Sequence, residues 1–308
     1  MSENNTKIEY FTVPDFHFDG GRRQDVMVAY RSFNSSSTLG TVLIPTCFGG
    51  RINKTLNFTS GALKDHNDCV NSQYALLTQH LGIRSLEAVV GFSMGGQQAY
   101  YWAVMHGSGT NPFVKRAIII CGSAKTSGLN YAFLEGPSSA LIASCDYDQG
   151  RYRLNDIKPI NGLRAFGRAY AAWVPSAEWF RQELWRKSGA RDLHEWLHPP
   201  IGSSSYEKWD PEDLLVKVRM WQAGDVGAVV GNGDYRSALE GITANVLLMP
   251  GSTDQYFSVD DSRTEVKFLR DGTIEPIPSI WGHMAGGGAN PVDVEWMDAK
   301  IAQFMARL

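Results

Sequence analysis

Short runs of apolar, β-branched residues alternate with helical patterns over residues 1–125 of the chain and again over residues 241–308. This alternation is typical of βαβ units that build a mostly parallel sheet. The pattern predicts helices over 94–106 and 291–308, and a fully buried strand over 41–46. The other predicted strands are 8–13, 24–33, 85–92, 114–124, 245–254 and 273–283.

The strand pattern stops between residues 126 and 240. That stretch has helical periodicity and a high tryptophan content, with Trp173, Trp179, Trp185, Trp196, Trp209 and Trp221. Such rings are usually buried where helix packs on helix, and we expect most of them to be plain core. The chain is therefore predicted to have an α/β core with a mostly parallel sheet, formed by residues 1–125 and 241–308. An inserted helical cap, or lid, is predicted over residues 126–240.

The overall composition is that of an ordinary globular protein. Of the 308 residues, 20% are charged and 43% are hydrophobic, with a formal net charge of −3. This balance argues against a nucleic-acid partner, and no apolar stretch reaches the roughly 18 residues of a membrane span. The N-terminus lacks the layout of a signal peptide, so we expect a protein kept inside the cell. Its cysteines are expected to be reduced: Cys47, Cys69, Cys121 and Cys145.

The segment Gly91-Phe92-Ser93-Met94-Gly95 is a G-x-S-x-G motif. It follows the apolar run of residues 86–90 and precedes a helical pattern. This is the strand, tight turn and helix that a nucleophile elbow requires. Glycines are needed there because the turn crowds the backbone around a strained serine. The context predicts that Ser93 is a nucleophile.

A serine nucleophile needs a histidine base, and the imidazole needs a carboxylate to fix its tautomer. The nucleophile elbow is typical of the α/β-hydrolase fold, in which the chain order is serine, acid, histidine. Asp254 follows the next-to-last predicted strand, and His283 follows the last one. Asp260 and Asp261 open the next helical pattern, which favours a capping role. The remaining histidines lack either the order or the strand-end position: His17, His66, His80, His106, His194 and His198.

A tetrahedral intermediate needs two N–H donors aimed at its oxyanion. Met94, directly after the nucleophile, is predicted to supply one. Cys47 or Phe48, in the loop after the strand 41–46, is predicted to supply the other, beside paired glycines that let a ligand approach. The sequence has no metal-ligand spacing or nucleotide motif placed after a strand. We therefore predict no metal and no cofactor, with acyl-CoA as a candidate substrate.

Four segments carry a resemblance to a known family: residues 91–103, 121–133, 209–227 and 281–293. Together they resemble the homoserine O-acetyltransferase-like branch of the α/β hydrolases, from about residue 40 to the C-terminus. Within it the chain is more similar to fungal secondary-metabolite hydrolases of the AK- and AF-toxin clusters. The resemblance implies a Ser-Asp-His triad, a peroxisomal setting and a homodimer formed through the caps.

The chain departs from that branch beside the predicted base. Homoserine transferases carry an aspartate directly after the histidine, where this chain has Met284. The departure argues against homoserine as the substrate. The transferases also bind the substrate carboxylate through a cap arginine, which Arg164 or Arg168 would match. Trp281 and Met284 are expected to contact the substrate with Arg168.

A second departure lies between Gly50 and Ser93, where the chain is about forty residues shorter than the family. One strand beside residues 41–46 is expected to be absent. Either the sheet lacks an inner strand, or the sequence reflects an altered gene model or splice form. Loss of an inner strand would remove hydrogen-bond partners from its neighbours. The departure bears on the scaffold rather than on the triad.

The last three residues, Ala306-Arg307-Leu308, fit the small-basic-leucine pattern of peroxisomal addresses. They predict recognition by the peroxisomal import receptor, with the cytoplasm as the alternative location. They also lie at the end of a predicted helix.

These observations favour a serine hydrolase that acts on a small-molecule ester or acyl thioester. The resemblance implies a place in fungal toxin biosynthesis. One alternative is an O-acyltransferase that uses acyl-CoA and the same acyl-enzyme. Another is a catalytically impaired homologue that lacks a core strand.

Overall fold

The structure of the protein is a computed structural model that describes residues 7–50, 65–155, 157–199, 206–230 and 233–307. Its strands are β1 (Glu9–His17), β2 (Arg23–Tyr30), β3 (Val42–Leu43), β4 (Ala88–Phe92), β5 (Arg116–Ile120), β6 (Asn245–Met249) and β7 (Gly272–Ile274). Its α-helices are α1 (His66–Ala75), α2 (Met94–His106), α3 (Gly128–Ile142), α4 (Ile160–Ala171), α5 (Ala177–Arg181), α6 (Leu193–Leu197), α7 (Pro211–Gln222), α8 (Tyr235–Glu240), α9 (Val259–Glu265) and α10 (Pro291–Met305).

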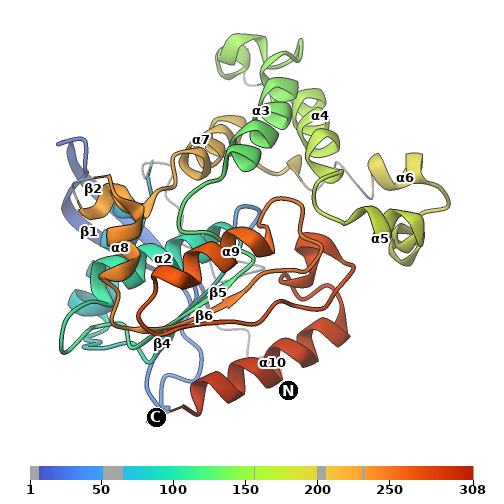
Figure 1. Cartoon of the computed structure of the whole chain (residues 1–308). Helices are drawn as coiled ribbons and strands as arrows, with labels where there is room; N and C mark the ends of the chain where they lie inside the picture. Colours follow the sequence, from blue (N-terminus) through green and yellow to red (C-terminus); the bar gives the residue numbers. More distant parts are fainter. Residues whose placement is uncertain (1–6, 51–64, 156, 200–205, 231–232, 308) are drawn as a thin grey trace.

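A parallel sheet with the strand order β3-β4-β5-β6-β7 forms the centre of the molecule. Helices lie on both of its faces, with α2 on one side and α10 on the other (Figure 1). The inner strands are apolar because parallel strands covered on both faces are buried. Strands β1 and β2 form a separate antiparallel hairpin. The predicted α/β architecture, a mostly parallel sheet flanked by helices, is thus confirmed.

The segment 41–46 differs from its prediction as a fully buried strand. Only two residues pair, as β3, and Val42 and Ile44 are 47% and 43% exposed. The reason is position: among the described residues β3 pairs with β4 alone, so it forms an edge of the sheet. The expected absence of a further strand beside it stays a prediction. Residues 51–64, in the shortened stretch, lie outside the described residues.

The last strand is also shorter than the predicted 273–283. Pairing with β6 ends at Ile274, apart from one isolated bridge between Gly251 and Ile277. Pro276 and Pro278 lack the N–H that a continuous ladder needs, so the chain leaves the sheet there. The chain after β7 is therefore free to turn over the carboxyl ends of the strands.

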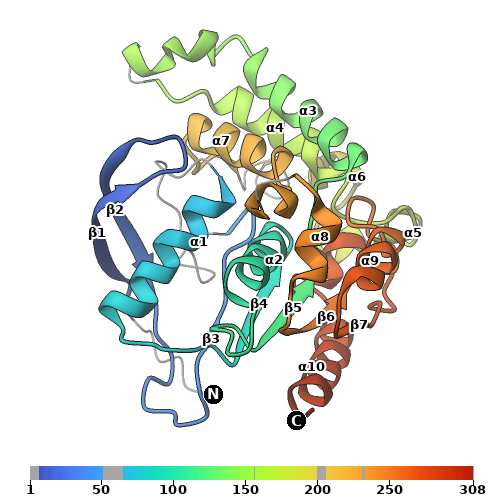
Figure 2. The same ribbon diagram turned by 60° about the vertical axis from the view of Figure 1, so that its left-hand side comes forward.

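The helices α3 to α7 lie together above the carboxyl ends of the sheet strands (Figures 1 and 2). Most of the tryptophans in this region are core, as predicted, since Trp179, Trp185, Trp209 and Trp221 are buried. The short helix η5 (Val226–Val230) already contacts α2 and α8 of the central layer. That residues 126–240 form a separate cap domain stays a prediction. The last part of this segment packs on the core.

The closing helix α10 confirms the predicted helix over the C-terminal segment. Arg307 beyond it is tied to the sheet, because its guanidinium donates to Thr273 and its carbonyl accepts from Arg116. Leu308, the last residue of the predicted peroxisomal address, lies outside the described residues. No helix in the described part of the chain is both long and apolar enough to cross a membrane.

Candidate active site

Ser93 lies in a sharp turn between β4 and α2. Its backbone has φ 59° and ψ −128°, a strained conformation for a residue with a side chain. The turn is crowded as expected: a Cβ on Gly91 would lie 2.0 Å from the Gly95 carbonyl oxygen, and one on Gly95 would lie 2.7 Å from the Pro45 carbonyl oxygen. Ser93 therefore has the backbone geometry of the predicted nucleophile elbow.

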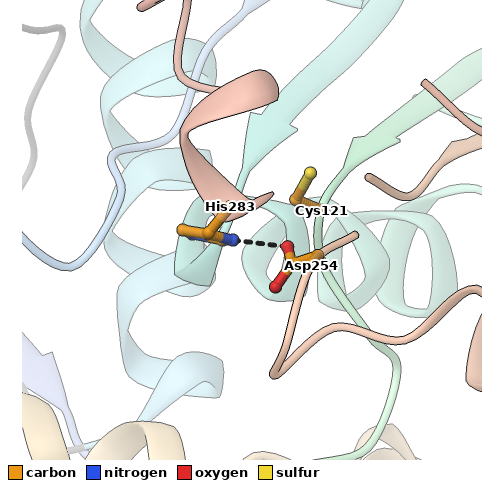
Figure 3. Close-up of side chains that lie close together, drawn as sticks. All are labelled: Cys121, Asp254 and His283. Carbon is orange, nitrogen blue, oxygen red and sulfur yellow. Dashed lines mark hydrogen bonds and ion pairs between the residues drawn. The ribbon is translucent and has the colours of Figure 1, made fainter. Parts of the chain in front are cut away.

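Asp254 and His283 come together at the carboxyl end of the sheet, from the loops after β6 and β7 (Figure 3). His283 Nδ1 lies 2.7 Å from Asp254 Oδ2. The other carboxylate oxygen accepts hydrogen bonds from the backbone N–H groups of Tyr256 and Phe257, at 3.1 and 3.2 Å. Both side chains are buried. The carboxylate is thus held in place by the start of its own loop and fixes the orientation of the imidazole.

The imidazole of His283 is also held by aromatic rings. Its centroid lies 4.7 Å from that of Phe92, 4.4 Å from that of Tyr256 and 5.4 Å from that of Phe257. Its Nε2 is buried and has no hydrogen-bond partner among the described residues, so no bond to Ser93 is formed here. Catalytic hydrogen bonds are often long in unliganded enzymes and tighten when substrate binds. Nε2 is available to exchange a proton with a group in the cavity.

The rival carboxylates lie elsewhere. Asp260 forms an exposed ion pair with Arg263 in the first turn of α9, and Asp261 is also exposed. The predicted capping role of these two aspartates is wrong in detail, because Ser258 is the N-cap and its hydroxyl accepts from the Asp261 N–H. In the described part of the chain, His283 is the only histidine that lines the cavity around Ser93.

A cavity of about 340 Å³ lies against Ser93 and His283. Five of its thirteen described lining residues are Phe or Tyr, and no Asp, Glu, Lys or Arg is among them. Burial raises the pKa of three tyrosines in the wall, which keeps their hydroxyls protonated as hydrogen-bond donors: Tyr170, Tyr206 and Tyr256. The Tyr256 hydroxyl is buried and has no partner among the described residues. The cavity suits an uncharged, partly polar small molecule.

The loop of residues 46–50 forms one edge of this cavity through Cys47, Phe48 and Gly49. No backbone acceptor among the described residues bonds to the N–H of Phe48. Met94 begins α2, where the first N–H groups of a helix lack intrahelical partners. The N–H groups of Phe48 and Met94 are therefore available as oxyanion donors on the two sides of the elbow. Burial raises the pKa of the Cys47 thiol, which argues against a thiolate nucleophile there.

The three residues predicted to contact the substrate do not all line the cavity. Met284 lines the cavity, while Arg168 and Trp281 do not. Trp281 packs instead against Trp179 in a cluster of cap aromatics. Arg164, the other candidate, forms an ion pair with Glu207 at 2.8 Å. The structure therefore gives neither cap arginine a place beside the reacting atoms.

Cys121 is a neighbour of the site that sequence reasoning missed. Its Sγ, a carboxylate oxygen of Asp254 and a ring nitrogen of His283 all lie within 4.8 Å of one another (Figure 3). Burial, and then the charge of Asp254, hold the pKa of this thiol well above its ordinary value. A cysteine binds a metal as a thiolate, which the raised pKa disfavours. His283 Nδ1 already bonds to Asp254. The three residues therefore fit an Asp–His pair supported by a neighbouring thiol better than they fit a metal centre. The only sequence signal was a cysteine directly after a strand.

The chain is similar in sequence to known enzymes. No protein-family model matches the chain. It is 31% identical to an ethyl acetate hydrolase of Pseudomonas veronii over 272 residues, which span 86% of this chain and 76% of that relative. A probable esterase of Corynebacterium glutamicum is 34% identical over 221 residues, or 70% of this chain and 60% of the relative. A homoserine O-succinyltransferase of Paraburkholderia phytofirmans is 31% identical over 66% of this chain and 56% of the relative.

Solved structures extend the similarity to the whole fold. An acetylester hydrolase from Corynebacterium glutamicum has a TM-score of 0.88 at 25% identity, covering 98% of this chain and 96% of that one. The acetyl esterase MekB has a TM-score of 0.88 at 27% identity, covering 100% and 99%. A homoserine O-acetyltransferase from Bacillus anthracis shares the fold, with a TM-score of 0.76 at 18% identity over 98% of each chain. The chain is therefore an enzyme of the α/β-hydrolase superfamily, with esterases and homoserine O-acyltransferases as its relatives.

Proposed function

We propose that this enzyme hydrolyses small carboxylic esters or acyl thioesters through an acyl-enzyme on Ser93. The observation that carries the proposal is the 2.7 Å contact between His283 Nδ1 and Asp254 Oδ2, beside a cavity that Ser93 also lines. The similarity to an ethyl acetate hydrolase and to an acetylester hydrolase supports a short acyl group.

In the first half of the reaction, Ser93 Oγ attacks the acyl carbon and its proton passes to His283 Nε2. The Asp254 carboxylate stabilises the imidazolium that results, and it stays ionised. Negative charge develops on the former carbonyl oxygen. The N–H groups of Met94 and of the 46–50 loop are the donors for this oxyanion. The imidazolium then gives its proton to the leaving oxygen or sulfur, which departs as an alcohol or thiol.

In the second half, a water molecule gives a proton to His283 and attacks the acyl carbon. Collapse of the second tetrahedral intermediate releases the carboxylic acid and returns the proton to Ser93. The wall of the cavity is rich in aromatic rings and has no Asp, Glu, Lys or Arg among its described residues, which favours neutral esters over charged acyl groups.

Transfer of the acyl group to an alcohol is the second candidate. The homoserine O-succinyltransferase relatives favour it, because transfer would use the same acyl-enzyme with an alcohol in place of water. Two observations favour hydrolysis: Met284 stands directly after the histidine, and neither cap arginine lines the cavity. The impaired homologue predicted from the short 50–93 stretch is the third outcome of the same test.

The test uses the purified protein and its Ser93→Ala variant, given p-nitrophenyl acetate and acetyl-CoA with and without alcohol acceptors. We expect free acetate from the wild-type protein and background rates from the variant. An ester product without free acid would favour transfer. Equal rates in both proteins would indicate that the protein is the catalytically impaired homologue.

We also propose the setting that the resemblance implies: the enzyme acts on an acyl intermediate in fungal toxin biosynthesis. The peroxisomal address at residues 306–308 stays a prediction from the sequence. Deleting these three residues from a fluorescent fusion tests the address, because an unchanged distribution of fluorescence would rule it out.

A further inference from the structure

The 46–50 loop is clamped by side chains of the cap. The Phe48 ring is 2% exposed, and its centroid lies 5.6 Å from that of Tyr170 and 5.7 Å from that of Trp221. Phe166 stacks on it at 6.3 Å. On the other side, the Gln98 side chain of α2 donates to the Thr46 carbonyl at 3.1 Å. The backbone between these anchors has little freedom to move.

A buried lysine of the cap also reaches this loop. Lys217, on α7, is 7% exposed, and its ammonium donates to the Cys47 carbonyl oxygen at 3.5 Å. The same ammonium lies 4.6 Å from the centroid of the Trp209 ring and 5.8 Å from that of Phe48. Two aromatic faces therefore hold the cation at the carbonyl.

The bond to the Cys47 carbonyl acts on the next amide. The Cys47 C=O and the Phe48 N–H belong to one planar trans peptide, in which they point in opposite directions. The Gly50 N–H donates to the same oxygen at 3.2 Å, and a cation beside it adds to the orientation of the Phe48 N–H and draws electron density away from it. Phe48 lines the cavity beside Ser93, and its N–H has no acceptor among the described residues.

We propose that Lys217 is a positioning residue, which orients and polarises the Cys47–Phe48 peptide so that the Phe48 N–H binds the oxyanion formed at Ser93. This inference rests on the proposed ester hydrolysis. A packing role alone does not account for the residue, because burying an ammonium is costly and an uncharged chain of similar length would fill the same space. The cap then contributes to the chemistry as well as to the shape of the cavity.

The test compares Lys217→Met with Arg219→Met, which removes an exposed cation from the same helix. For Lys217→Met we expect kcat on p-nitrophenyl acetate to fall about tenfold with KM within about twofold. This is less than the hundredfold or more that follows loss of an oxyanion donor, because the N–H itself remains. Arg219→Met is expected to match the wild-type protein.

A pair of inhibitors separates positioning from general damage. An alkyl trifluoromethyl ketone forms an oxyanion on the serine, and the matching methyl ketone serves as the ground-state analogue. Lys217→Met should lose about as much affinity for the first as it loses in kcat, and little for the second. Lys217→Gln keeps a neutral donor, so its kcat and its affinity for the trifluoromethyl ketone should lie between those of Lys217→Met and those of the wild-type protein.

The outcomes are distinguishable. Should Lys217→Met fail to fold, the ratio of the two inhibitor affinities in folded Lys217→Gln decides the question. An active wild-type enzyme whose Lys217 variants keep kcat and both affinities would overturn the role of Lys217 alone. A wild-type protein that does not hydrolyse the ester, or a Ser93→Ala variant that does, would overturn the proposed function itself.

Discussion

His283 Nδ1 lies 2.7 Å from Asp254 Oδ2, although the two residues come from different loops of the sheet. A carboxylate in this position accepts from the Nδ1–H and leaves Nε2 as the basic nitrogen. Replacement by an amide would reverse that preference. The contact is therefore the most direct target for mutation.

We predict that Asp254→Asn lowers kcat for ester hydrolysis by about 10³- to 10⁴-fold with little change in stability, since the wrong imidazole tautomer is then favoured. Initial rates on p-nitrophenyl acetate measure the effect. Asp260→Asn, at an exposed position in α9, is the matched control and should retain the wild-type rate. A loss of only a few-fold in Asp254→Asn would remove Asp254 from the proposed triad.

Met284 is predicted to limit the length of the acyl group, because it lines a cavity of only about 340 Å³. Met284→Ala should raise the rate on p-nitrophenyl hexanoate relative to the acetate by about tenfold, in keeping with a gain of one or two kcal/mol from the space released. Met305→Ala, at the end of α10, leaves the cavity unchanged and serves as the control. An unaltered ratio of the two rates would place the acyl chain elsewhere.

Glu265 predicts a dependence of stability on pH. It is buried, accepts from the Tyr100 hydroxyl and the Ala124 N–H, and burial raises its pKa to about 8. Between the ordinary value of about 4.5 and pH 8, the unfolded chain loses this proton while the folded chain keeps it. The free energy of unfolding should therefore fall as pH rises through this window.

Glu265→Gln removes that contribution: its amide oxygen can still accept from the Ala124 N–H, while its NH2 group can donate to the Tyr100 oxygen and so reverses that hydrogen bond. We expect the variant to gain stability relative to the wild-type protein as pH rises from 5 to 8, by a few kcal/mol at most. Urea unfolding at the two pH values gives the difference. A constant offset between the two proteins would contradict a raised pKa for Glu265.

The elbow itself is predicted to reject a side chain at Gly91. A Cβ there would lie 2.0 Å from the Gly95 carbonyl oxygen, so Gly91→Ala should displace the turn and cost several kcal/mol of stability. Gly136→Ala, in α3 where a Cβ meets nothing within 4 Å, should be neutral or stabilising. Thermal melting of the two variants checks this. Equal melting temperatures would indicate a looser elbow.

Much of the site could be predicted from the sequence because strand order decides it. Ser93, Asp254 and His283 each follow a strand of a parallel sheet, and the carboxyl ends of such strands meet at one edge. Their relative positions therefore follow from the order of the strands. The helix after Ser93 was also predictable, and α2 has the predicted bounds.

Other features depend on contacts that no local pattern encodes. Cys121 lies beside Asp254, and its backbone adopts φ 45° directly after β5. Arg164 pairs with Glu207, a partner distant in the sequence, and so lies away from the cavity. The exposure of Val42 depends on which strand lies beside β3. Each outcome is set by neighbours that the fold brings together.

The central claim is that ester hydrolysis proceeds through a covalent intermediate on Ser93. Its most direct test treats the wild-type protein with diethyl p-nitrophenyl phosphate and follows the intact mass, the modified peptide and the remaining esterase activity together. We predict a single phosphoryl adduct on the peptide that contains Ser93, formed in step with the loss of activity and absent from Ser93→Ala. Full activity in a completely modified protein, or an adduct confined to another residue, would contradict the account.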